Sequence, residues 1–136
     1  METPYFIIDK NSLEKNLFDM LNGFRSKLES CIIGYSLKTN SLPWIVRFLY
    51  ENGCYIEVVS KDEFELAKYL RIPLNKIIYN GPIKSKDSVL ELINADGILN
   101  IDSFEEINWL KNIKNRKLKV GLRINIDLEY YCPNET

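Results

Sequence analysis

Histidine is absent from the 136-residue sequence. Imidazole is the usual general base and a common metal ligand near neutral pH, so mechanisms that need it within this chain are excluded. The three cysteines (positions 31, 54 and 132) are odd in number, and no two are separated by only two residues. They therefore predict neither a disulfide framework nor a zinc site, and we expect no metal. Chemistry must then use Lys, Asp, Glu, Tyr, Cys or Ser.

A charge excess and long apolar runs are also lacking. Eighteen Lys and Arg oppose 19 Asp and Glu, which gives a formal charge of -1, and the basic residues are scattered, so nucleic acid is not an expected partner. Runs such as "WIVRFLY" fall far short of the roughly 20 residues that span a membrane, and the N-terminus does not resemble a signal peptide. We expect a cytoplasmic protein without a membrane segment.

Glycine-rich phosphate loops are missing as well. Neither GxGxxG nor GxxxxGK[ST] occurs, which argues against nucleotide binding. What the chain has is the composition of one soluble globular domain, with 46% hydrophobic and 27% charged residues.

Five short β-rich segments recur at regular spacing: residues 31–38, 55–60, 76–81, 97–102 and 119–125. Starts at positions 32, 55, 77, 97 and 119 are separated by 23, 22, 20 and 22 residues. Each interval is close to the length of one strand-helix unit. The stretch "PYFIID" near the N-terminus predicts one further short strand.

Helical patterns with start signals lie between these strands. The pairs Ser60/Glu63 and Ser103/Glu106 have the spacing of capping boxes, and Ser85 is expected to cap the intervening helix. Another helix is expected to begin at Ser41 and Pro43 and to end at Gly53. The first helix is predicted to open at Asn11 and Glu14, with one apolar face made of Leu13, Leu17, Leu21, Phe24 and Leu28.

Strands that alternate with helices predict the α/β class and a parallel sheet, because each parallel connection needs a crossover. Two architectures fit: a doubly wound open sheet, complete at five strands, and a partial (βα)₈ barrel that ends after its fifth strand. The number of strands does not choose between them. A receiver-like doubly wound domain should carry an acidic cluster at the end of its first strand, where this chain has Lys38.

The carboxyl ends of parallel strands are where ligands bind in either architecture. All five expected ends are polar, although Ser60, Asp102 and Ser103 are interpreted first as helix caps. Lys38 is not explained by capping, and a buried ammonium without a partner is costly. An amine at the mouth of a desolvated site can instead be a nucleophile that forms a Schiff base with an aldehyde; the alternative is a lysine that simply extends to the rim.

Six ordered blocks resemble a known family: "TPYFIIDKNSLEKNL", "GYSLKTNSLP", "GCYIEVVSKDEFELA", "IIYNGPIKSKDSV", "ILNIDSFEEI" and "VGLRIN". Together they cover roughly residues 3–126 and resemble the N-terminal half of the fold-type III pyridoxal-phosphate enzymes, above all the diaminopimelate and ornithine decarboxylases, with alanine racemase more distant. The resemblance implies that residues 1–136 form the N-terminal portion of the cofactor-binding barrel, without the C-terminal β domain.

The resemblance also implies the cofactor and its ligands. Lys38 matches the lysine that holds pyridoxal 5'-phosphate covalently, and Glu57 falls where the family usually has an aspartate facing the cofactor. Asn80 matches the end of the third strand, which lines the pocket, and Arg123 matches an arginine close to the cofactor ring. Glu63 matches a family carboxylate, for which helix capping is an equally good explanation. The substrate would be a small amino acid that loses carbon dioxide.

Some residues depart from the family pattern. Glu57 adds a methylene beside the cofactor, and Lys61-Asp62 replaces a pair that is more often glycine-rich. The histidine that commonly stacks on the ring, the phosphate loop and the acidic partner of the ring nitrogen are absent from the sequence. We therefore expect little decarboxylation by these residues alone. A non-catalytic homologue or truncated gene product that acts by subunit association remains the alternative, with self-association through open sheet edges.

Overall fold

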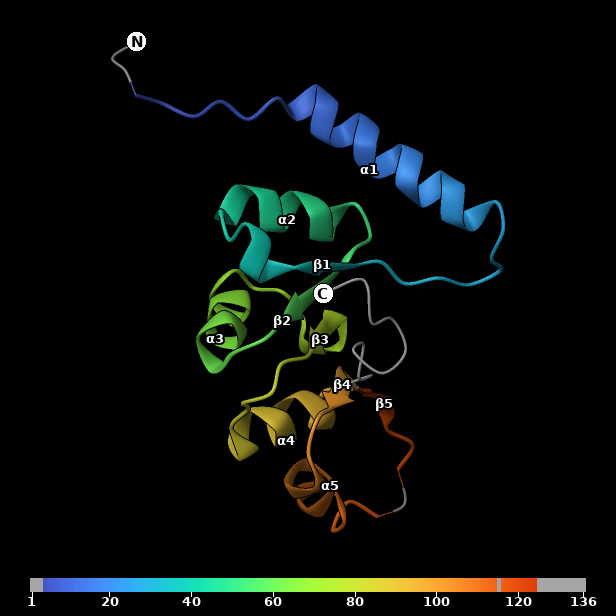
Figure 1. Cartoon of the computed structure of the whole chain (residues 1–136), viewed down its shortest axis with the longest axis vertical. Coiled ribbons are helices and arrows are strands. Elements are labelled where there is room, and N and C mark those ends of the chain that lie inside the picture. The colour runs from blue at the N-terminus through green and yellow to red at the C-terminus, as the bar shows by residue number, and fades with distance from the viewer. Residues whose placement is uncertain (1–3, 115, 125–136) are drawn as a thin grey trace, which may run out of the picture.

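The computed structural model describes residues 4–114 and 116–124 (Figure 1). Within them lie the strands β1 (Gly34–Ser36), β2 (Tyr55–Val58), β3 (Ile77–Tyr79), β4 (Ile98–Ile101) and β5 (Lys119–Leu122). The α-helices are α1 (Lys10–Arg25), α2 (Pro43–Glu51), α3 (Lys61–Tyr69), α4 (Lys86–Asn94) and α5 (Phe104–Leu110). Short 3-10 turns cover Leu37–Thr39 and Leu74–Lys76. All five expected strands are present but shorter than predicted. Position 125, the last residue of the fifth expected segment, and Cys132 lie outside the described residues.

The sheet decides between the two predicted architectures. Its strands are all parallel and follow the order β1-β2-β3-β4-β5, so each strand pairs with the next one in the chain. A doubly wound sheet reverses its strand order at a switch point, whereas a barrel adds strands in sequence. The α/β class and the partial (βα)₈ barrel are therefore confirmed. In the described part of the chain, β1 and β5 are the two edges of the sheet.

The two faces of the sheet differ in polarity. One face carries Ile56, Val58, Ile77, Tyr79 and Leu99, which pack with helix residues such as Val46, Phe64 and Val89 into a buried core. Alternate side chains point to opposite faces, and the register pairs Ser36 with Glu57 and Glu57 with Ile78. These residues lie on the second face, which would line the barrel interior. This inner face is only half-buried.

The predicted serine caps are confirmed. The hydroxyls of Ser60, Ser85 and Ser103 accept hydrogen bonds from the backbone N–H groups of the residues three positions later, at 3.2, 3.2 and 3.3 Å. The carboxylates of Glu63 and Glu106 complete the two capping boxes by accepting from Val59 N and Asp102 N at 2.8 and 2.9 Å. Each glutamate therefore reaches the residue before the cap, one position earlier than in the usual capping box.

Three predictions for the first half of the chain were wrong in detail. Helix α1 is capped by Asp9, whose carboxylate accepts from the N–H groups of Asn11 and Ser12, and not by Asn11. Helix α2 begins at Pro43, as predicted, but Leu42 and not Ser41 occupies its N-cap position, and no side chain caps it. Residues 4–8 form no strand, because no neighbouring strand pairs with them within the described residues, and Phe6 is fully exposed.

The apolar face of α1 is only partly buried. Leu17 and Leu21 pack against Ile45 and Leu49 of α2, whereas Phe24 and Leu28, predicted to belong to the same face, remain about half exposed. In Figure 1, α1 runs along the outside of the molecule beyond α2.

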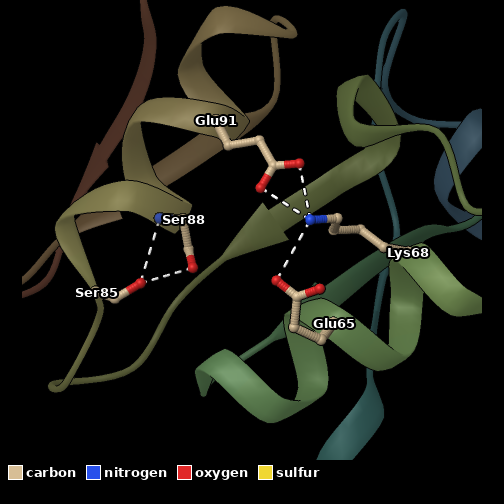
Figure 2. Close-up of polar contacts among 5 residues, drawn as sticks. All are labelled: Glu65, Lys68, Ser85, Ser88 and Glu91. Atoms are coloured by element: carbon tan, nitrogen blue, oxygen red, sulfur yellow. Dashed lines mark hydrogen bonds and ion pairs between the residues drawn. The ribbon is translucent and has the colours of Figure 1, made fainter.

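Helices α3 and α4 are joined on their outer surface by Lys68 (Figure 2). Its Nζ lies 2.8 Å from Glu91 Oε1 on α4 and 3.3 Å from Glu65 Oε1 on its own helix. The hydrogen bond to Glu91 is the main cause that raises the pKa of Lys68. Because these side chains are partly exposed, the contacts are expected to contribute little to the free energy of unfolding.

Candidate functional site

Lys38 lies in the 3-10 turn that follows β1, two residues past the last strand residue. Its side chain is exposed and borders a shallow hollow with Ser41, Asp62 and Glu63. The expectation of a buried amine was wrong, since the strand ends at Ser36 and the turn carries Lys38 to the rim of a sheet whose inner face is open. No hydrogen bond or ion pair joins the amine to another described residue.

Glu57 and Asn80 are brought together by neighbouring strands. Glu57 lies on the inner face of β2, and Asn80 follows the last residue of β3. Asn80 Nδ2 donates to Glu57 Oε1 at 2.9 Å. Both residues are half-buried, so this hydrogen bond fixes the direction of the glutamate carboxylate at the polar end of the sheet.

Arg123 follows β5 and forms an ion pair with Asp102, which follows β4. The Nε and Oδ1 atoms are 3.1 Å apart, and the aspartate side chain is 17% exposed. Asp102 was interpreted from the sequence as a helix cap. That interpretation was wrong, because Ser103 caps α5 and leaves the Asp102 carboxylate to bind the guanidinium.

The structure also has a buried ion pair near these strand ends that was not predicted from the sequence. Lys84 Nζ lies 2.9 Å from Glu106 Oε1, and both side chains are almost completely buried. Glu106 was recognised as the glutamate of a capping box, but nothing in the spacing of the sequence indicates that Lys84, 22 residues earlier, is its partner.

The sequence profile of the family described as "Pyridoxal-dependent decarboxylase, pyridoxal binding domain" matches residues 14–133. The chain belongs to this family. The predicted resemblance and the expected pyridoxal cofactor are thereby confirmed at the level of the family.

Individual relatives agree with this family assignment. The chain is 30% identical to the diaminopimelate decarboxylase of Methanocaldococcus jannaschii over 131 residues, which are 90% of this chain and 30% of that protein. It is 26% identical to the Aquifex aeolicus diaminopimelate decarboxylase, covering 93% of this chain and 30% of the relative. The chain thus spans about a third of the length of these curated relatives.

Solved structures show the same fold. The diaminopimelate decarboxylase from M. jannaschii superposes with a TM-score of 0.67 at 28% identity, over 84% of this chain and 27% of that one. The Helicobacter pylori enzyme complexed with L-lysine gives a TM-score of 0.76 at 24% identity, over 92% of this chain and 32% of that one. None of the helices in the described ranges is long and apolar enough to cross a membrane.

The inner face of this chain has groups that fit part of a pyridoxal cofactor. Ser36 Oγ and Asn80 Oδ1 are buried polar atoms without a hydrogen-bond partner among the described residues. Ser36 is the strand neighbour of Glu57, which binds Asn80, so the three lie side by side at the ends of β1, β2 and β3. Because unpaired buried polar atoms are costly, a polar ligand or water is expected here, and Lys38 is the amine nearest in sequence to this group.

Proposed function

We propose that this chain forms the cofactor-binding N-terminal portion of a pyridoxal-phosphate-dependent amino-acid decarboxylase. Residues 1–136 would be one part of that enzyme, and a C-terminal β domain would complete it. The match of the family profile to most of the chain supports this proposal, as do the polar strand ends. The observation that carries the site assignment is the row of Ser36, Glu57 and Asn80, with two buried polar atoms that lack partners.

Each residue has a proposed task. Lys38 would hold the cofactor through its amine, which an open rim allows it to bring over the inner face. Glu57, kept in place by Asn80, would lie against the ring, and Arg123, oriented by Asp102, would supply positive charge nearby. When bound, pyridoxal phosphate supplies the electron sink for the electrons released as carbon dioxide leaves the α-carbon.

The substrate is proposed only as a small amino acid. The M. jannaschii diaminopimelate decarboxylase structure in complex with L-lysine is 27% identical to this chain, but a relative that is 30% identical is named L-glutamyl-[BtrI acyl-carrier protein] decarboxylase. These names differ in the group carried beyond the α-carbon, so the common feature is an α-amino acid. We expect little or no turnover by the chain alone, because the phosphate loop and the acidic partner of the ring nitrogen are not in its sequence.

Cofactor attachment is the test. Pyridoxal phosphate added to the purified chain should produce an absorbance band near the edge of the visible range, and borohydride reduction followed by peptide mass spectrometry should find the cofactor on Lys38. Lys38→Ala should remove both signals. Lys61→Ala, which removes an exposed lysine after β2, is the matched control and should keep them. Labelling spread over many lysines, or unchanged by Lys38→Ala, would contradict the proposal.

Among residues 4–114 and 116–124, no strand pairs with the outer edges of β1 and β5. These edges favour an alternative, a non-catalytic chain that acts by subunit association, and they also support oligomerisation of an active one. Leu122 on β5 is 70% exposed, and unpaired strand edges readily associate. Sedimentation should show concentration-dependent association that Leu122→Lys weakens. Tyr69→Lys, at an 82% exposed position on α3, should have no effect. Association without any Lys38-dependent band would favour the alternative.

We also propose a cytoplasmic location. Cys31 and Cys54 form no disulfide with each other or with any other residue that the structure describes, and unpaired thiols are usual in a reducing compartment.

A further inference from the structure

The Lys84–Glu106 ion pair is buried beneath the strand ends. Lys84 lies in the loop between β3 and α4, and Glu106 lies in the first turn of α5. Their side chains are 0% and 2% exposed. Lys84 Nζ also donates to the backbone oxygen of Gly81, directly after Asn80. One ammonium therefore joins the end of β3 to the helix that follows β4.

Stability alone does not explain such a pair. Removing two charges from water costs several kcal/mol per ion, and well-packed apolar residues often replace a buried pair without loss of stability. What a buried pair supplies more reliably is geometry, because both partners must keep one arrangement to avoid an uncompensated charge.

The second carboxylate oxygen of Glu106 connects the buried pair to Asp102 and, through it, to Arg123. Glu106 Oε2 accepts a hydrogen bond from Asp102 N at 2.9 Å, and Asp102 Oδ1 lies 3.1 Å from Arg123 Nε. A continuous series of polar contacts thus runs from Gly81 at the end of β3, through Lys84, Glu106 and Asp102, to Arg123 after β5. It leads from the residue next to Asn80 to the one guanidinium proposed for the cofactor site.

We infer that Lys84 and Glu106 are positioning residues that hold the Asp102 backbone and thereby orient the Arg123 guanidinium towards the inner face. The consequence for cofactor binding rests on the proposed function, whereas the ordering of Arg123 does not. Neither residue would touch the cofactor. Their effect would pass through Asp102.

The test uses double variants that leave no lone buried charge. Lys84→Met with Glu106→Leu removes the pair and the acceptor for Asp102 N. Lys84→Met with Glu106→Gln removes both charges but keeps a side-chain oxygen that can accept from that N–H. Lys68→Met with Glu91→Leu removes the surface pair between α3 and α4 and is the matched control. Hydrogen exchange of Arg123 Nε–H and Asp102 N–H is measured by NMR on the full chain, with the pyridoxal phosphate dissociation constant as a second readout.

In the variant Lys84→Met with Glu106→Leu, called the Met/Leu variant, Arg123 Nε–H and Asp102 N–H should exchange about tenfold faster or more. The dissociation constant of pyridoxal phosphate should rise about fivefold. The Met/Gln variant should keep Asp102 N–H close to its parent rate, and the control should change neither. Unchanged Arg123 exchange in a folded Met/Leu variant would overturn the inference. If the Met/Leu variant does not fold, fast exchange of Asp102 N–H in the Met/Gln variant would overturn the inference. A parent chain that binds no cofactor while these exchange rates follow expectation would count against the proposed function alone.

Discussion

Asn80 Nδ2 donates a 2.9 Å hydrogen bond to Glu57 Oε1, from the end of β3 to the inner face of β2. The glutamate carboxylate makes this contact from a side chain one methylene longer than that of aspartate. Glu57→Asp should therefore lose the hydrogen bond and about 1 kcal/mol of unfolding free energy, measured by urea denaturation.

A double-mutant cycle separates this contact from other effects of the same substitutions. Asn80→Ala should cost a similar amount in the parent and much less in the Glu57→Asp background, with a coupling energy of about 1 kcal/mol. Additive effects of the two substitutions would mean that the hydrogen bond contributes nothing to stability.

Helix α1 should lose its N-terminal cap at low pH. Hydrogen bonds from the side chain and the N–H of Ser12 hold the pKa of Asp9 below its ordinary value of 3.8. A lowered folded-state pKa means that the stabilisation is present above about pH 4 and is lost as the pH falls through the folded pKa. Amide exchange at Asn11 and Ser12 should rise in that range. Asp9→Asn keeps an acceptor that does not titrate, so its exchange should stay independent of pH beyond the intrinsic rate.

The parallel α/β class and the serine caps could be predicted because both follow from short-range patterns, whereas the strand order that distinguishes a barrel from a doubly wound sheet could not. Ser60 and Ser103 lie three residues before a glutamate, and a strand-helix unit needs the spacing that the chain shows. The exposure of Lys38 could not be predicted in this way. It depends on where β1 ends and on how far the sheet closes, which no local pattern fixes. Likewise, Asp102 is next to a capping serine in sequence, but its partner Arg123 comes from another strand.

Gly81 should not tolerate a side chain. Its φ is +92°, and a Cβ there would lie 2.3 Å from the backbone oxygen of Val59. Since backbone strain and the clash add, Gly81→Ala should lower the unfolding free energy by about 3 kcal/mol in urea denaturation. Gly23 in α1 has nothing within 4 Å of its Cβ position. Gly23→Ala should therefore stabilise the protein by about 0.5–1 kcal/mol, and a loss of equal size in both variants would contradict this explanation.

Tyr79 buries its hydroxyl in the core without a hydrogen-bond partner among the described residues. Its ring stacks on Phe64 with centroids 5.3 Å apart, so the hydroxyl is the costly part of the side chain. Tyr79→Phe should keep the stacking and raise the unfolding free energy at pH 7 by about 1 kcal/mol.

The same substitution should change the alkaline limb of the stability curve. Burial, with smaller effects from the charges of Glu106 and Glu63, raises the pKa of Tyr79 from 10.0 to about 12. A raised folded-state pKa means that the unfolded chain loses this proton first, so the stabilisation is complete below pH 10 and falls as the pH approaches 12. The difference between Tyr79→Phe and the parent should grow by on the order of 2 kcal/mol across this range. Tyr69→Phe, at an exposed position, should follow the parent, and parallel curves for all three proteins would show that the Tyr79 hydroxyl is not desolvated.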